Sequence, residues 1–128
     1  MLDKIRLADK KELPPGYNLG DEKPTWFDGN CCRFLQVEYA QIVGRVRLGC
    51  SDDEILRWAY ETGNRRTQEE IMIWNSFMAK RGWRDQATPS LNRWKTELGF
   101  NGRDDIQTFF DLYDADEGRE IGAACYLD

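Results

Sequence analysis

Residues 51–82 read SDDEILRWAYETGNRRTQEEIMIWNSFMAKRG and contain two helix starts of the same kind. In each start a hydroxyl residue is followed three positions later by a glutamate: Ser51 by Glu54, and Thr67 by Glu70. This arrangement is a capping box, in which the hydroxyl accepts from the glutamate amide and the carboxylate reaches back to the first backbone N–H. The stretch therefore predicts two successive helices, each ended by a glycine.

Three further segments show the spacing of amphipathic helices, with apolar residues recurring every three or four positions. They cover residues 31–48, 88–98 and 104–115, and Asp28 is the expected N-cap of the first. No segment alternates apolar and polar residues as a strand does. The sequence therefore predicts an all-α fold, a compact bundle of about five short helices over residues 28–119.

The ends of the chain differ from this helical part. Residues 1–27 contain Pro14, Pro15 and Pro24, and each proline lacks a backbone donor and restricts the residue before it to extended conformations. We therefore expect an irregular N-terminal arm packed on the domain, and a tail over residues 120–128 that is apolar enough to dock. The expected anchors of the arm are Leu13, Tyr17, Leu19, Trp26 and Phe27.

The overall composition is that of one globular domain. The chain has 128 residues, of which 41% are hydrophobic and five are tryptophan, enough for a core without a metal or disulfide. No apolar run approaches the roughly 18 residues of a membrane helix, and the N-terminus leads into charge rather than into a signal region. We expect a soluble, cytoplasmic protein with reduced cysteines and no membrane partner.

The charge argues against nucleic-acid binding. The net charge is -5, whereas nucleic-acid binding depends on neutralising phosphates. Residues 1–103 carry 17 basic and 15 acidic side chains, and residues 104–128 carry one basic and eight acidic. The two capped helices resemble a helix-turn-helix in length, but Glu69 and Glu70 in the first turn of the second would repel phosphate.

The chain has no histidine, which removes the commonest general base and metal ligand. The acidic residues Asp114, Asp116 and Glu117 do not match a calcium loop, because counting from Asp114 a cysteine, Cys125, stands where the final glutamate is needed. No C-x-x-C pair exists that would bind zinc or perform thioredoxin-like chemistry. We therefore expect no metal, no cofactor and no catalytic residues, although catalysis by carboxylates, lysines or thiolates stays open.

Two groups of residues are candidates for a site. Cys31 and Cys32 lie near a helix N-terminus, where the helix dipole can lower a thiol pKa and create a redox-active cysteine. The alternative is that both are small buried apolar residues. Neither interpretation is excluded by the sequence.

The second group could bind a ligand. Arg66, Arg81 and Arg84 could hold a small anion, or the latter two, with Lys80, could simply offset a helix C-terminus. Trp74 and Asn75 could form the floor of a pocket or an internal polar network that fixes helix packing.

Several motifs resemble a bacterial family of unknown function, DUF5069. They are Arg66-Thr67-x-Glu69-Glu70-Ile71-x-x-Trp74-Asn75, Arg81-Gly82-x-Arg84-Asp85, Thr108-Phe109-Phe110-Asp111 and Asp114-x-Asp116-Glu117-Gly118-Arg119. The resemblance extends from about residue 13 to residue 119. It implies a small bacterial cytoplasmic protein and supplies no activity, substrate, cofactor or catalytic residue. Within the last motif, we expect Gly118 to end a helix and Arg119 to turn back onto the preceding acids.

The leading hypothesis is a non-enzymatic helical module that binds a protein partner or a small ligand, with self-association as one form of partner binding. A thiol-based redox or stress protein using Cys31 or Cys32 is one alternative. A small enzyme that acts on an anionic metabolite through carboxylates and arginines is another.

Overall fold

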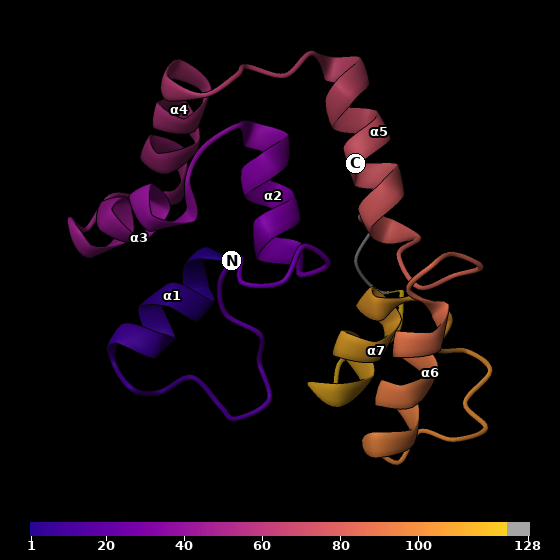
Figure 1. Ribbon diagram of the computed structural model, residues 1–128. Coiled ribbons are helices and arrows are strands. Elements are labelled where there is room, and N and C mark those ends of the chain that lie inside the picture. Colours follow the sequence, from indigo (N-terminus) through magenta and orange to yellow (C-terminus); the bar gives the residue numbers. More distant parts are fainter. Residues whose placement is uncertain (123–128) are drawn as a thin grey trace. The chain divides into compact units, whose positions relative to one another are not determined.

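The computed structural model describes residues 1–122, and these form seven α-helices and no strand (Figure 1). The predicted all-α class is confirmed. The chain divides into two compact units, residues 1–66 and residues 67–128, which are described in turn. The limits predicted at residues 28 and 119 stay a prediction, and most of the expected C-terminal tail, residues 123–128, lies outside the described residues.

The first unit contains four helices: α1 (Leu2–Asp9), α2 (Phe27–Leu35), α3 (Tyr39–Arg47) and α4 (Asp52–Thr62). Helix α3 packs against the other three. Their apolar faces meet in one core, whose buried members are Ile5, Cys32, Val37, Ile42, Val46, Ile55 and Ala59.

Helix α1 corrects the expectation of an irregular arm over residues 1–27. The prolines begin only at Pro14, and nothing before them prevents a helix. Ile5 is 2% exposed, and Arg6 forms ion pairs with Asp3 one turn earlier and with Asp52 at the start of α4. Core burial and these charge pairs hold a helix that is short and weak by sequence alone. Residues 10–26 follow without a helix.

The segment 31–48 forms two helices instead of the single helix predicted. Gln36 takes a left-handed conformation with φ 57° and ends α2, and Glu38 then opens α3 by a capping box with Gln41. Apolar positions keep a helical spacing across the break, so periodicity alone does not reveal it.

The prediction that Asp28 caps the first of these helices is wrong, because α2 begins at Phe27 and Trp26 occupies the cap position. The Asp28 side chain is instead buried within the first unit. It lies 2.8 Å from the ammonium of Lys4 and accepts from the Gly20 amide at 3.2 Å. Asp28 therefore ties α1 and the following loop to α2.

The second unit contains α5 (Gln68–Ala79), α6 (Thr88–Glu97) and α7 (Phe109–Asp116). Helices α6 and α7 pack together, and Leu91, Ile106, Phe109 and Leu112 are the buried apolar residues. None of the described helices in either unit combines the length and hydropathy required to cross a membrane.

The predicted capping boxes of α4 and α5 are confirmed. The hydroxyl of Ser51 accepts from the Glu54 amide, and that of Thr67 accepts from the Glu70 amide. In both cases the glutamate carboxylate accepts from the amide of the cap residue, at 2.7 and 2.8 Å.

The last two helices begin at positions other than those predicted. Ala87, not Thr88, occupies the cap position of α6. Helix α7 begins at Phe109 rather than near residue 104, because Thr108 and Asp111 form a further capping box there.

At the other end of α7, the predicted return of Arg119 onto the acids is confirmed. Its guanidinium pairs with the buried Asp114 at 2.8 Å and with Glu117. This pairing offsets the cost of acids near the C-terminal end of a helix.

Candidate functional site

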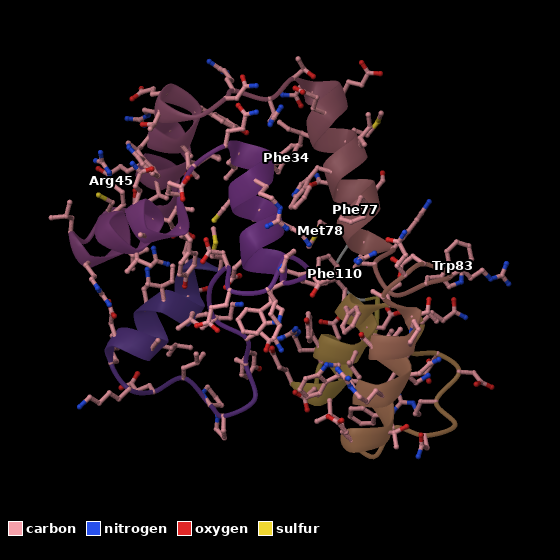
Figure 2. The ribbon with its side chains drawn as sticks, viewed as in Figure 1. Phe34, Arg45, Phe77, Met78, Trp83 and Phe110 are labelled. Atoms are coloured by element: carbon pink, nitrogen blue, oxygen red, sulfur yellow. The ribbon has the colours of Figure 1, made fainter. Side chains whose placement is uncertain are left out.

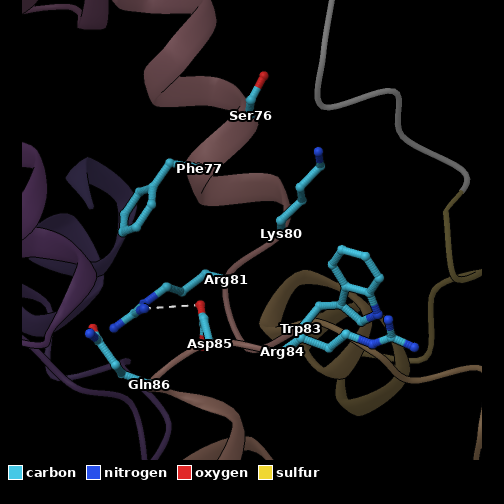
Figure 3. A pocket seen from close by; sticks show the side chains of 8 residues that line it. All are labelled: Ser76, Phe77, Lys80, Arg81, Trp83, Arg84, Asp85 and Gln86. Atoms are coloured by element: carbon cyan, nitrogen blue, oxygen red, sulfur yellow. Dashed lines mark hydrogen bonds and ion pairs between the residues drawn. The ribbon is translucent and has the colours of Figure 1, made fainter.

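An open groove lies at the turn between α5 and α6, with a cavity volume of about 880 Å³. Figure 3 shows the side chains that line it, which are Ser76, Phe77, Lys80, Arg81, Trp83, Arg84, Asp85 and Gln86. All of them come from the last turn of α5 and the connection to α6, so the groove belongs wholly to the second unit.

The turn is held in one conformation by Gly82 and Asp85. Gly82 has φ +100°, and an added Cβ would lie 3.0 Å from Leu91 Cδ2 and 3.2 Å from Phe109, so only glycine fits this position without strain. The Asp85 carboxylate accepts from the amides of Gly82 at 3.1 Å and Ala87 at 2.7 Å. The backbone beneath the groove is thereby closed into a tight loop.

Thr88 fastens this loop to α6. Its hydroxyl accepts from the Asp85 amide at 2.9 Å and donates to the Gly82 carbonyl at 2.9 Å. Its role in the turn explains why it is not the N-cap of α6.

Arg81 is the inner cation of the groove. It pairs with Asp85 at 2.9 Å, and its guanidinium lies 5.4 Å from the centre of the Phe77 ring. Its Nε is buried and has no hydrogen-bond partner among the described residues. Burial acts to raise the pKa of Asp85, but the Gly82 and Ala87 amides and the charge of Arg81 outweigh it and hold that pKa below its usual value. Asp85 is therefore a committed counter-ion for Arg81.

Lys80 and Arg84 are exposed, whereas Arg81 is half-buried, and we call them the outer cations of the groove. Arg84 has φ 52°, a left-handed conformation, and its guanidinium lies 5.1 Å from the centre of the exposed Trp83 ring. Figure 2 and Figure 3 show Trp83 on the connection between α5 and α6, and Figure 3 shows Arg84 beside it. Neither Lys80 nor Arg84 forms an ion pair with a carboxylate of the described residues. The groove thus carries three cationic side chains and a single carboxylate.

This arrangement suits an anionic group. A guanidinium presents several N–H donors in a plane that matches a carboxylate or phosphate, and an ammonium adds a mobile point charge. Phe77 and Trp83 are 45% and 43% exposed and offer apolar ring surface beside the charges. The groove can therefore contact both an anionic group and an apolar or planar part of the same small molecule.

Of the predicted ligand-binding residues, the structure brings Arg81 and Arg84 together in this groove. Arg66 belongs to the first unit, where its Nε donates to the Phe34 carbonyl at 2.7 Å and its guanidinium lies 4.9 Å from the Phe34 ring centre. Trp74 and Asn75 are half-buried on α5 and do not line the groove.

Sequence reasoning missed the contribution of Lys80, Trp83 and Asp85. The signal for them is the order of residue types over residues 80–85, in which cations, a glycine, an aromatic residue and an acid follow directly on a helix end. Without their neighbours, the cations of this stretch are accounted for by their position at a helix C-terminus, where positive charge offsets the helix dipole.

The two cysteines of the redox hypothesis, Cys31 and Cys32, lie on α2 in the first unit and not in the groove. Cys32 is 4% exposed and belongs to the core of the first unit, whereas Cys31 is half-buried. Burial raises the pKa of Cys31, and it raises that of Cys32 to about 12. Both thiols are therefore protonated at neutral pH, which favours the interpretation as buried apolar residues.

A second, smaller hollow of about 410 Å³ lies along α4 in the first unit. Its lining residues are Asp53, Leu56, Arg57, Tyr60, Glu61 and Arg65. Acidic and basic side chains are balanced there, so this hollow has no preference for one sign of charge. Among the described residues, no cluster of three or more acidic or cysteine side chains has the arrangement of a metal site.

Comparison with known proteins identifies the family but not an activity. No curated protein and no solved structure shows significant similarity to this chain. One family pattern matches residues 1–119, so the match includes α1 and all the motifs quoted above. Because this match covers most of the sequence, the chain belongs to the family described as a domain of unknown function (DUF5069).

Proposed function

We propose that this protein is a non-enzymatic binding module that takes a small ligand with an anionic group into the groove between α5 and α6. The observation that carries the proposal is the pair of outer cations. Lys80 and Arg84 line the groove without a carboxylate partner among the described residues, while the one acid there, Asp85, is committed to Arg81.

The electrostatics favour an anion over a cation or a neutral ligand. Three positive groups confined to one turn repel one another, and a bound anion relieves that repulsion. The buried Nε of Arg81 adds a donor that has no acceptor within the described chain, and a buried donor without an acceptor is costly. A phosphate or carboxylate in the groove relieves the repulsion, and it accepts from Arg81 Nε as well only when that side chain turns, because the atom is buried in this structure.

The aromatic side chains narrow the ligand class further. Trp83 and Phe77 are both more than two-fifths exposed, and each lies beside an arginine. A guanidinium stacked on a ring leaves its N–H edge available for an acceptor. We therefore expect a ligand that joins an anionic group to a planar or apolar body.

Binding fits this groove better than catalysis. Its only carboxylate has a lowered pKa and accepts hydrogen bonds from two backbone amides, so Asp85 is a weak proton acceptor. Ser76 is the only hydroxyl in the lining, and the lining contains no histidine that would activate it.

A cytoplasmic location and the absence of a nucleic-acid partner belong to the same proposal. Cys31, Cys32 and Cys50 are free thiols, as expected in a reducing compartment. The net charge of -5 disfavours the long phosphate backbone of nucleic acids, whereas one local cluster of cations can still hold one small anion.

A titration of the full ¹⁵N-labelled chain with phenyl phosphate and, separately, with inorganic phosphate tests the proposal. We expect saturable shifts at the backbone amides of residues 80–87, with tighter binding of phenyl phosphate. Arg84→Gln removes charge-assisted hydrogen bonds and should weaken binding roughly tenfold or more. Arg93→Gln removes the same charge from exposed α6 and should leave the affinity unchanged.

Three results would contradict this function. Shifts spread evenly over the surface indicate unspecific ion binding. Equal effects of Arg84→Gln and Arg93→Gln place the site elsewhere. Release of free phosphate from phenyl phosphate by the purified protein, lost in Arg84→Gln, shows an enzyme instead of a binding module.

A further inference from the structure

Helix α5 is apolar around almost its whole circumference. Six of its residues are large and apolar: Ile71, Met72, Ile73, Trp74, Phe77 and Met78. None of its residues is fully buried, and Met72 and Ile73 are 62% and 59% exposed. A helix at the surface of a monomer normally presents polar residues to water, and one that is apolar on all sides is normally covered on all sides.

The residues of α5 separate into two opposite faces. At 100° per residue, the half-buried Ile71, Trp74 and Met78 share one side of the helix. The opposite side, which we call the outer face, consists of Glu69, Met72, Ile73, Ser76 and Lys80. The outer face is apolar at its centre and carries an acid at its N-terminal end and a base at its C-terminal end.

We propose that the outer face of α5 packs against the same face of a second copy of this chain, with the two helices antiparallel about a two-fold axis. Met72 and Ile73 of each copy form the centre of the contact. The result is a homodimer in which the side chains of Met72 and Ile73, now exposed to water, are covered.

The charges at the two ends are the reason for choosing a second copy as the occupant. Lys80 comes about three turns after Glu69, so the two lie in line on the outer face. Antiparallel packing places Glu69 of each copy opposite Lys80 of the other, and the two-fold axis produces this pair twice. A parallel arrangement would instead bring like charges together, so the surface is complementary to itself in one orientation only.

The size of the face predicts a weak dimer. A helix of 12 residues is about 18 Å long, and a single helix pair buries less than the roughly 1,200 Å² of a stable interface. Association should therefore depend strongly on protein concentration.

The dimer face and the ligand groove share Ser76 and Lys80. An anion that engages Lys80 competes with Glu69 of the second copy for the same ammonium. Ligand binding and dimerisation should therefore oppose one another, and by linkage the effect is reciprocal. The dimer itself does not depend on the proposed ligand, so either proposal can fail without the other.

Sedimentation velocity of the full chain from about 1 µM to 1 mM tests the dimer. We expect a monomer–dimer equilibrium. Ile73→Glu places a carboxylate at the centre of the contact and should raise the dissociation constant at least roughly tenfold. Circular dichroism should remain unchanged, because Ile73 is 59% exposed.

A charge exchange tests the orientation. E69K and K80E should each weaken self-association, because each places like charges opposite one another at both ends. An equimolar mixture of the two variants should recover dimerisation, because opposite charges then meet in the mixed dimer. D53K is the matched control: Asp53, like Glu69, is the second residue of a capped helix, and this change should leave the equilibrium as in the wild type.

A chain that stays monomeric up to about 1 mM overturns the proposal and assigns the outer face to another occupant, such as the C-terminal tail or a different protein. A dimer that is insensitive to Ile73→Glu also overturns it, because another surface then mediates association. If the mixture of E69K and K80E is no more dimeric than each variant alone, the antiparallel arrangement is wrong.

Discussion

The ammonium of Lys4 in α1 lies 2.8 Å from the carboxylate of Asp28 in α2, and the Asp28 side chain is 4% exposed. Lys4 Nζ also donates to the carbonyl of Asn18 at 2.6 Å. One ammonium therefore holds together the first helix, the loop that follows it and the second helix.

This pairing predicts that Lys4→Met destabilises the protein although it adds apolar surface. The change leaves the buried Asp28 carboxylate without its cation, and the cost should be about 1–3 kcal/mol, because Lys4 is itself partly exposed. Chemical denaturation followed by circular dichroism measures it. Arg93→Met is the control, since Arg93 and Glu97 are 3.8 Å apart on the exposed side of α6 and such pairs contribute at most about 1 kcal/mol. Equal losses in the two variants would contradict the assigned role of Lys4.

A second prediction concerns the floor of the groove. Gly82→Ala adds a Cβ within 3.0 Å of Leu91 and 3.2 Å of Phe109, at a residue with φ +100°. Backbone strain and overpacking together should lower the free energy of unfolding by about 2–4 kcal/mol. Gly44→Ala is the matched comparison, because Gly44 lies within α3 with no atom within 4 Å of the added Cβ. That change should stabilise the protein by about 0.5–1 kcal/mol, and a loss of stability there would contradict the assigned geometry of α3.

The features that could be predicted from the sequence are those set by neighbouring residues. The boxes at Ser51 and Thr67 need only a hydroxyl, a glutamate and a fixed spacing. The ion pair of Arg119 with Asp114 is equally local.

The features that could not be predicted depend on distant contacts. The break at Gln36 uses a left-handed conformation that no glycine signals. Helix α1 is stabilised by residues of α3 and α4, such as Asp52. The guanidinium of Arg66 stacks on Phe34 in the same unit, a contact between positions too far apart in the sequence for spacing to reveal, and the part of Arg66 in an anion site stays a prediction.

The lowered pKa of Asp85 predicts a local response to acid. A carboxylate with a depressed pKa stabilises the folded state at pH values above its ordinary pKa of 3.8, and this contribution is lost as the pH falls through the lower folded value. Protonation releases the hydrogen bond from the Gly82 amide. The NMR shift of that amide should therefore titrate with a midpoint below 3.8, and in Asp85→Asn the transition should disappear. A midpoint above 3.8 would show that burial outweighs the amides and Arg81.

The cysteines provide a final prediction, which separates the binding module from the thiol-based alternative. Burial raises the pKa of Cys31, and it raises that of Cys32 from 9.0 to about 12. Because the thiolate is the reactive form, iodoacetamide should modify both cysteines slowly at pH 7.5 in the folded protein and rapidly after denaturation. Mass spectrometry of the digested chain resolves the two positions.

The raised pKa of Cys32 also determines how the stability of the protein responds to alkaline pH. A group whose folded pKa is raised contributes stability that is complete below its unfolded value of 9.0 and is lost as the pH rises toward the folded value of about 12. The free energy of unfolding should therefore decline above pH 9, and it should decline less steeply in Cys32→Ala. Part of the decline remains in that variant, because burial also raises the pKa of Tyr39 to about 12. Rapid modification of Cys31 or Cys32 in the folded chain at neutral pH would contradict this assignment and restore the redox hypothesis, because the raised pKa of both thiols keeps the reactive thiolate scarce at that pH.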